Sequence, residues 1–179
     1  CVLWSEVRFL SFSVAAVAAS VLLGVTTRAA IIQLGATLDG AQANAGGGTG
    51  SPGTGTAIAT FDDATSLFSW NISWSGLTAP ETVMHFHGPA TPNQNATVQV
   101  DVGTISGKSS PSIGSTTITA GQAAELTSGL WYFNIHTTAF PGGEIRGQVG
   151  VVPEPASIGL VGGVVALGTV LVVRRKRRR

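Results

Sequence analysis

The feature that most constrains the fold of this 179-residue chain is an alternation of apolar and polar residues between positions 66 and 75. The apolar positions all carry even numbers: Phe68, Trp70, Ile72 and Trp74. Serine or asparagine occupies each position between them. Because successive side chains of a β-strand point to opposite faces, this pattern predicts a strand with one face in the core.

The same period of two recurs in four further segments: 32–38, 98–102, 131–135 and 145–149. A helical pattern occurs in one short segment, 119–126, where Thr119 can cap the helix and Gly129 can follow its end. Several short strands without long intervening helices predict an all-β fold, either a sandwich or a barrel. The Gly-rich stretch 44–55 has little apolar content, so we expect it to form a mobile loop.

The N-terminal 29 residues have the pattern of a secretory signal peptide. Arg8 precedes the uncharged stretch 9–25, and small residues follow, with Ala29 as the expected cleavage position. An uncleaved membrane anchor is the alternative, because Arg28 stands next to that position. Cleavage would remove Cys1, which is the single cysteine, so the exported body would contain no thiol for a disulfide, a metal site or a nucleophile.

The C-terminal segment 153–179 combines three features: the motif Pro153-Glu154-Pro155, the uncharged run 156–173 and a basic tail of five arginines and one lysine. As a helix with a rise of about 1.5 Å per residue, the run would extend about 27 Å, close to the ~30 Å hydrocarbon core of a bilayer. Clustered cations stay on the cytoplasmic side, so residues before the motif would lie outside. A buried core helix with a solvated charge run is the alternative.

This C-terminal arrangement resembles the PEP-CTERM sorting signal of Gram-negative bacteria. The resemblance implies that an exosortase recognises and cleaves the chain near Pro153-Glu154-Pro155. It also implies an inner-membrane-anchored precursor, followed by delivery of the body to the cell surface or the extracellular matrix. Without cleavage, the expected outcome is periplasmic retention with a scaffold role.

Between these ends, residues 30–152 have the length of one domain. They contain two cations, Lys108 and Arg146, against seven carboxylates, which gives a formal charge of −5 with neutral histidines. Nucleic-acid binding requires clustered cations, so this composition excludes nucleic acid as an expected partner. No Gly-x-Ser-x-Gly elbow is present, and Asp62 and Asp63 would point to opposite faces of a strand, so the sequence does not indicate a hydrolase.

All three histidines of the chain fall in two segments. His85 and His87 form a His-x-His pair, and on a strand both rings would face one side, about 6.5–7 Å apart. His136 and Asn134 alternate with apolar neighbours and should lie on the face away from the core. The three imidazoles could therefore share one metal ion. The alternative is that they are surface or hydrogen-bonded structural histidines.

Glu144 and Arg146 also share one face of their expected strand. Two structural roles are open to them: an ion pair with each other, or hydrogen bonds from Arg146 to loop carbonyls. Gly142 and Gly143 precede them and are typical of a turn that needs a special backbone geometry.

The order of these segments resembles the CHRD domain, the module repeated in chordin and found singly in bacterial secreted proteins. The resemblance runs from Leu34 to Val149 and rests on four segments: 38–42 (LDGAQ), the 75–78 and 85–90 pair (SGLT, HFHGPA), 132–137 (YFNIHT) and 141–148 (PGGEIRGQ). It assigns structural roles to a set of motif residues: Asn134, Gly143, Glu144, Arg146 and Gly147. The chain departs from the family pattern at 43–45, which bears on the first loop.

The CHRD resemblance implies an immunoglobulin-like or Greek-key β-sandwich or barrel, with a distant similarity to copper/zinc superoxide dismutases. A dinuclear copper/zinc site needs about six histidines and an aspartate, and this chain has three histidines. A mononuclear copper or zinc site remains open, with Asn134, Met84 or Glu144 as candidate extra contacts.

Together these observations predict an exported CHRD protein that acts as a non-enzymatic binding or structural module at the envelope. Its candidate partners are the exosortase, the membrane through the C-terminal helix, and extracellular polysaccharide or surface proteins. The competing hypothesis is a mononuclear copper or zinc protein, with a redox role, that uses His85, His87 and His136.

Overall fold

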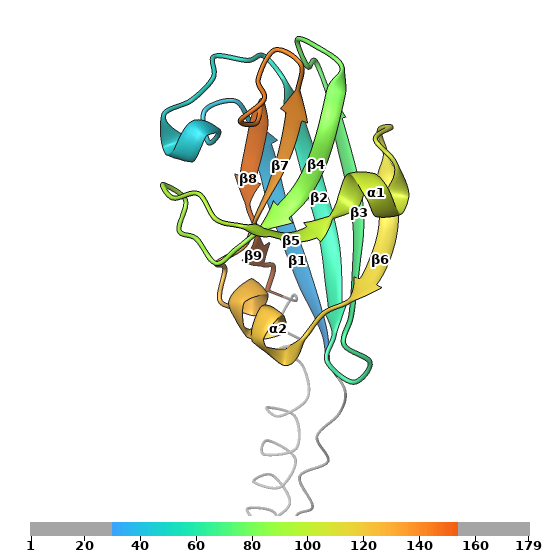
Figure 1. Cartoon of the computed structure of the whole chain (residues 1–179). Helices are drawn as coiled ribbons and strands as arrows, with labels where there is room; N and C mark the ends of the chain where they lie inside the picture. Colours follow the sequence, from blue (N-terminus) through green and yellow to red (C-terminus); the bar gives the residue numbers. More distant parts are fainter. Residues whose placement is uncertain (1–29, 154–179) are drawn as a thin grey trace, which may run out of the picture.

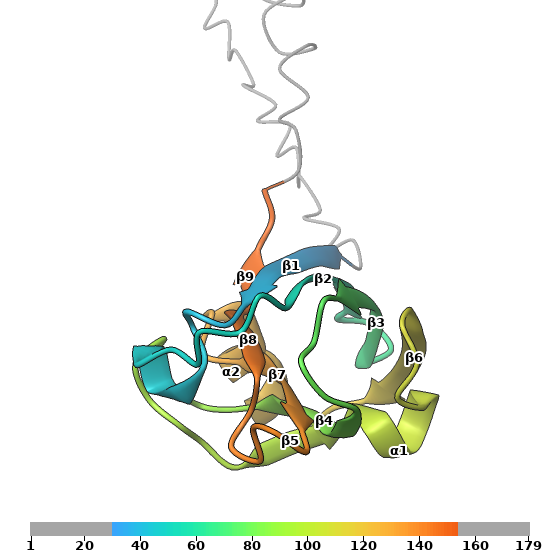
Figure 2. The same cartoon turned by 90° about the horizontal axis from the view of Figure 1, so that it is seen from above.

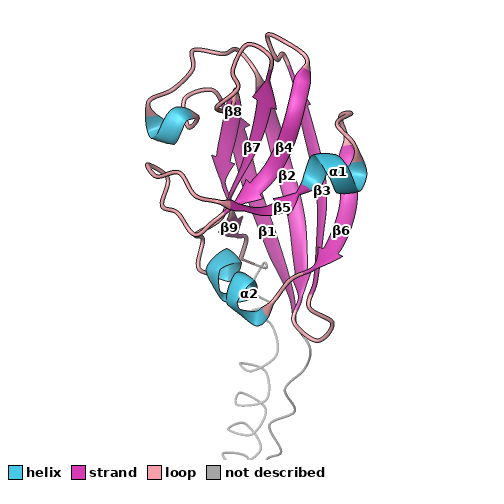
Figure 3. Ribbon diagram, viewed as in Figure 1, coloured by secondary structure: helices cyan, strands magenta, loops and turns pink. Residues whose placement is uncertain are grey.

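The computed structural model describes residues 30–153, which form a curled antiparallel sheet with two short α-helices (Figure 1). The strands are β1 (Ile31–Asp39), β2 (Thr54–Asp62), β3 (Leu67–Ser75), β4 (Glu81–His87), β5 (Val98–Asp101), β6 (Ser112–Thr117), β7 (Tyr132–Thr137), β8 (Ile145–Gln148) and β9 (Gly150–Val151). Their order across the sheet is β5-β4-β7-β8-β1-β2-β3-β6, and β9 pairs with β1 beside β8. The colouring by secondary structure shows strands as the main content (Figure 3).

The sheet curls so that its two edges approach each other (Figure 2). Helix α1 (Val102–Ser106) follows β5 and contacts both β4 and β6, which lie near opposite edges. Trp70 Nε1 donates to Ser106 Oγ at 3.1 Å, and Lys108 Nζ donates to the carbonyl of Thr82 at 3.0 Å. The α1 segment therefore spans the space between the sheet edges, and the expected all-β fold is confirmed in the form of a half-barrel.

The inner face of the curled sheet holds the hydrophobic core. Phe86 is central to it: its ring centroid lies 4.9 Å from that of Phe68 and 4.9 Å from that of Phe133. The even-numbered residues of β3 all point inward with exposed fractions of 7% or less, as the alternation predicted. The odd-numbered residues of β3 face outward. Side-chain alternation therefore decides which residues remain available for chemistry on the outer face.

The five segments predicted as strands all contain strands, and the strand considered for His85 and His87 is β4, but the sequence pattern missed β2, β6, β9 and α1. In β2 the inward positions include the small residues Ala57 and Ala59, which weaken the apolar signal. Val102 was expected to extend β5 and instead begins α1, because Asp101 caps that helix by accepting from Thr104 N at 3.0 Å. The predicted helix is confirmed as α2 (Ala120–Thr127), with a capping box between Thr119 and Gln122.

The expectation of an unpacked mobile loop at 44–55 was wrong. The segment contains a 3-10 turn, η1 (Asn44–Gly46), and its last two residues already belong to β2. Thr49 Oγ1 donates to the backbone carbonyl of Glu144 at 2.8 Å, and Ser51 Oγ donates to its carboxylate at 2.6 Å. Hydrogen bonds to one buried residue thus anchor a segment whose composition offers little apolar packing.

The predicted signal peptide, residues 1–29, lies outside the described residues, as do Glu154, Pro155 and the apolar run 156–173. Within residues 30–153, no helix has the length and apolar character that a membrane crossing requires. The two ends of the described segment lie close together, because Val151 of β9 pairs with Leu34 of β1.

The inward face of β3 supplies a direct test of the fold. Trp70 is 2% exposed and packs against Phe68 and Phe86, so Trp70→Ala should lower the free energy of unfolding by about 3–5 kcal/mol. Ser69→Ala, on the outer face, should change it by less than about 0.5 kcal/mol. Urea unfolding followed by far-UV circular dichroism measures both. Equal midpoints for the two variants would show that the faces of β3 are assigned wrongly.

Candidate metal centre

The three histidines meet on the outer face of the sheet, where β4 and β7 are neighbours. In β4, Met84 and Phe86 point into the core, which turns His85 and His87 outward. The register of β4 against β7 places His85 opposite Asn134 and His87 opposite Tyr132. His136 stands two residues beyond Asn134 on the same face of β7.

One ring nitrogen from each histidine lies within 4.8 Å of the other two. The ring centroid of His85 lies 5.4 Å from that of His87 and 5.4 Å from that of His136. Imidazole nitrogens bind zinc at about 2.0–2.1 Å, so three ligands of one tetrahedral ion lie about 3.3 Å apart. The three nitrogens would therefore have to approach one another by up to about 1.5 Å to reach that spacing.

Each histidine has one buried ring nitrogen without a hydrogen-bond partner: Nδ1 of His85, Nε2 of His87 and Nε2 of His136. Within residues 30–153, the only other buried side-chain polar atom in this condition is Oδ1 of Asn134, which belongs to the same cluster. Buried polar atoms in folded proteins are nearly always paired, and leaving one unpaired costs about 1–3 kcal/mol. Four unpaired atoms gathered at one place are typical of a site built for a ligand.

The opposite ring nitrogens of two histidines face backbone carbonyls. His87 Nδ1 lies 3.0 Å from the carbonyl oxygen of Ala96, and His136 Nδ1 lies 2.7 Å from that of Pro141. A carbonyl can only accept, so each Nδ1 must carry the proton, which leaves the Nε2 lone pair free. Metal-binding histidines are commonly oriented in this way by an acceptor at the second nitrogen.

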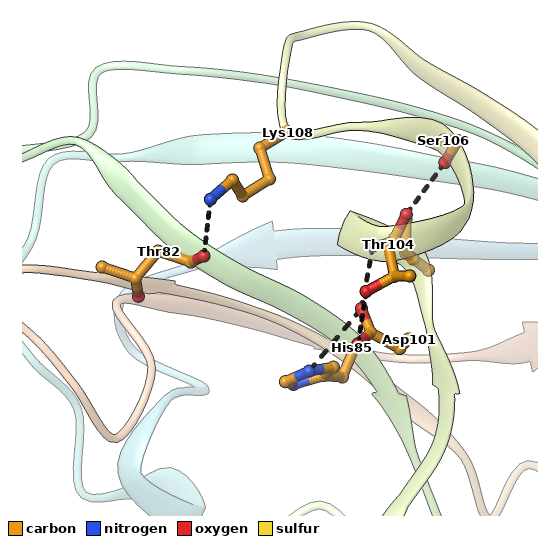
Figure 4. A network of polar contacts seen from close by, with 7 residues as sticks. Thr82, His85, Asp101, Thr104, Ser106 and Lys108 are labelled. Atoms are coloured by element: carbon orange, nitrogen blue, oxygen red, sulfur yellow. Dashed lines mark hydrogen bonds and ion pairs between the residues drawn. The ribbon is translucent and has the colours of Figure 1, made fainter.

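His85 has a carboxylate instead of a carbonyl at its second nitrogen. Its Nε2 lies 3.9 Å from Oδ1 of Asp101, which the register places opposite His85 on β5 (Figure 4). Burial acts to raise the pKa of Asp101, but hydrogen bonds from Thr104 outweigh it and lower that pKa. The ionised Asp101 therefore faces His85 Nε2, and Nδ1 is the buried nitrogen of this ring that has no partner.

Burial also keeps the rings of His85 and His87 neutral. It lowers the pKa of His87 from 6.5 to about 4, against the opposing effect of the Ala96 carbonyl. Burial is likewise the main cause that lowers the pKa of His85, while Asp101 opposes it. Metal ligation requires neutral imidazole, so at pH 7 both rings are in the form that can bind an ion.

Glu144 and Arg146, the charged pair of the Gly-Gly-Glu-Ile-Arg segment, do not form an ion pair with each other. Both carboxylate oxygens of Glu144 accept hydrogen bonds from hydroxyl and backbone donors: Ser51 Oγ, Thr78 N and Oγ1, and Thr137 Oγ1. Burial acts to raise the pKa of Glu144, but these hydrogen bonds lower it overall. Arg146 donates to loop carbonyls, so the second of the two expected roles is the one found.

Of the three extra contacts considered for a metal, two were wrong. Met84 is fully buried in the core, on the opposite face from the histidines, and both carboxylate oxygens of Glu144 already accept hydrogen bonds from other residues. Asn134 remains, with its unpartnered Oδ1 in the cluster. Its amide lies flat against Gly143, where a Cβ would overlap it, and the φ of Gly143 is +115°. Gly147 is needed for a similar reason, because a Cβ there would overlap the carbonyl of Thr37.

Sequence reasoning missed Asp101 and the two carbonyls that orient the rings. Asp101 lay in a segment predicted to be a plain strand, and no sequence signal links it to His85 across two strands. The loop carbonyls of Ala96 and Pro141 carry no residue-specific signal at all. Only the neighbouring prolines and glycines indicated that turns close over the histidines.

The fold and the cluster define a class: a curled all-β domain that carries three converging imidazoles on the outer face of its sheet. The chain belongs to the CHRD domain family, whose model matches residues 34–149. These bounds confirm the extent of the resemblance seen in the sequence. No match was found among curated proteins or among solved structures, so the expected similarity to copper/zinc superoxide dismutases stays a prediction.

The lowered pKa of His87 predicts a pH dependence for the stability of the metal-free protein. The unfolded chain takes up this proton below pH 6.5, whereas the folded chain takes it up only below about 4. The contribution of His87 to the free energy of unfolding is therefore fully present above pH 6.5, and it is lost as the pH falls from 6.5 to 4. Urea midpoints at pH 7, 6, 5 and 4.5 in the presence of a chelator measure the loss.

His87→Gln is the control for this titration, because it removes the ionising ring. Its midpoint should fall less over the same interval. Asp101 and Glu144 also have lowered pKa values, but their contribution is lost only as the pH falls below their ordinary pKa values of 3.8 and 4.5, and it is common to both proteins. Parallel curves for the two proteins would contradict the assignment to His87.

Proposed function

We propose that residues 30–152 form an exported CHRD binding module that holds one copper or zinc ion through His85, His87 and His136. The module would act at the cell surface or in the extracellular matrix of a Gram-negative bacterium. Two earlier hypotheses are thereby combined: a binding or structural module outside the cell, and a mononuclear metal centre as the way in which it binds.

The single observation that carries the metal site is the convergence of three unpartnered, buried imidazole nitrogens. Structural histidines would be expected to use both nitrogens, or to expose one to water. Here the carbonyls of Ala96 and Pro141 accept from Nδ1 of His87 and His136, and the Nε2 atoms of both rings are buried without a partner. An ion among them would supply the missing partner for all three rings at once.

The donor set restricts the ion. Three neutral imidazoles suit zinc and copper, while calcium and magnesium prefer oxygen ligands. Three protein ligands leave a fourth position for water or for the amide oxygen of Asn134. A redox role would follow only from copper, because zinc has no accessible second oxidation state.

Titration with Zn(II) and Cu(II) at pH 7.5 tests the site. The full chain in mild detergent, carrying Cys1→Ser to remove its only thiol, should bind one equivalent of ion. His85→Ala should lower the affinity at least tenfold, because two imidazoles hold an ion far less well than three. Isothermal titration calorimetry gives both the stoichiometry and the affinity.

Ser69→Ala in the same background is the matched control, since it changes the outer face of β3 and leaves the cluster intact. It should bind like the parent chain. All variants retain the basic tail, so the difference between them reports the histidines alone. If the parent chain gave a flat titration with both ions, the metal site would be refuted and the three histidines would have a structural role.

Export and sorting rest on the two terminal segments. Deletion of residues 153–179 should release the body as a soluble exported protein, because the apolar run and basic tail are removed with the motif. In a host that has an exosortase, the intact chain should be processed near Pro153-Glu154-Pro155. Mass spectrometry of surface-extracted protein decides the matter, and a surface form that still ends at Arg179 would refute the processing.

A further inference from the structure

Arg146 is a fully buried arginine without a carboxylate partner in the described part of the chain. Its side chain is 1% exposed, and its guanidinium donates to the carbonyls of Gln94 and Thr91 at 2.9 and 3.2 Å. Longer contacts of 3.4 Å reach Asn95 Oδ1 and Gln148 Oε1. Burying an unneutralised charge is costly. Two sets of contacts connect this guanidinium group with the histidine cluster.

The first route from Arg146 to the cluster passes through Tyr132. The guanidinium carbon lies 3.4 Å from the centre of the Tyr132 ring. That ring in turn stacks on His87, with centroids 4.9 Å apart and planes inclined by 7°. Because β7 lies between β4 and β8, Tyr132 is held between Arg146 on one side and His87 on the other.

The second route passes through the loop between β4 and β5. Arg146 fixes the carbonyls of Thr91 and Gln94, and the same loop supplies the carbonyl of Ala96 to His87 Nδ1. The backbone N–H of Ala96 donates to the hydroxyl of Tyr132 at 3.2 Å. The two routes therefore meet: one fixes the plane of the His87 ring, and the other fixes the acceptor at its Nδ1.

We propose that Arg146 is the positioning residue for His87. It holds this ring in the Nδ1–H tautomer, with Nε2 turned toward His85 and His136. The consequence for metal affinity rests on the proposed function, but the consequence for the tautomer concerns the metal-free protein. His136 has its own acceptor, the carbonyl of Pro141, and the hydrogen bonds and ring contact of Arg146 do not involve it.

An anion-binding role does not fit the same contacts. The guanidinium already donates to four oxygens of the protein through its two terminal nitrogens. A lysine could not replace it, because an ammonium group has neither the fork that spans two carbonyls nor the flat face that stacks on Tyr132. The sequence shows only that an arginine is present at position 146. The structure shows that both the fork and the flat face of its guanidinium group are used.

The tautomer can be read in the metal-free full chain, which contains only three histidines. With ¹⁵N-labelled histidine and a chelator present, long-range ¹H–¹⁵N spectra at pH 7.5 should show His87 as a single Nδ1–H tautomer. In Arg146→Met, and also in Arg146→Lys, the His87 signals should move toward a mixture of tautomers. The signals of His136 should stay where they are, and zinc affinity should fall about 10- to 100-fold.

Tyr132→Leu gives a second test, since it removes the stack and keeps Arg146. It should shift His87 in the same direction and leave His136 in place. Ile72→Ala, a core change on the inner face of β3, is the stability control and should alter the signals of neither His87 nor His136. Unchanged His87 signals in the Arg146 and Tyr132 variants would overturn the proposal, and so would equal shifts of all three rings, which would indicate a general structural role.

The two proposals fail in different ways. A parent chain that binds no ion but shows the His87 shift in Arg146→Met would refute the proposed function and support the positioning role. A parent chain that binds zinc with the same affinity as Arg146→Met, with unchanged His87 signals, would refute only the positioning role.

Discussion

The pairing of β4 with β7 is the interaction on which the rest of this structure depends. Its register brings a His-x-His pair and a third histidine, 49 residues later in the chain, onto one face. The same pairing places Phe86 and Phe133 together in the core on the other face. A shift of this register by one residue would exchange the two faces of a strand. The packing that buries the aromatic residues therefore also fixes the face on which the imidazoles converge.

Two buried charged residues, Glu144 and Arg146, hold the loops around the β4–β7 pair, and each does so through its own hydrogen bonds. Glu144 collects donors from the 49–53 and 76–78 segments, while Arg146 collects acceptors from the loop after β4. Neither charge is neutralised by the other, although they are two residues apart in the chain, with Glu144 just before β8 and Arg146 within it. Each instead makes most of its hydrogen bonds with polar atoms of the loops. This explains how a chain rich in glycine can keep defined loops around a polar site.

Much of the fold could be predicted because strand alternation is a local property. The positions of Phe68, Trp70 and Ile72 sufficed to predict the inner face of β3, and Thr119 with Gly129 sufficed for α2. The small inward residues Ala57 and Ala59 hid β2, since a weak apolar signal resembles a loop. The 44–55 stretch was misjudged for a related reason: its anchors lie on Glu144, about 90 residues away in sequence, and composition does not register such contacts.

The sequence by itself determined that the body is an all-β CHRD domain. It also determined that the candidate metal ligands are three histidines, one of which is far from the other two in the chain. It also determined which face of each strand they occupy, because alternation depends only on neighbouring residues. Tertiary structure alone decided that the three rings converge, which of their nitrogens are free, and that Asp101, Ala96 and Pro141 orient them. Those outcomes depend on strand order and register, and these are set by the packing of the whole curled sheet.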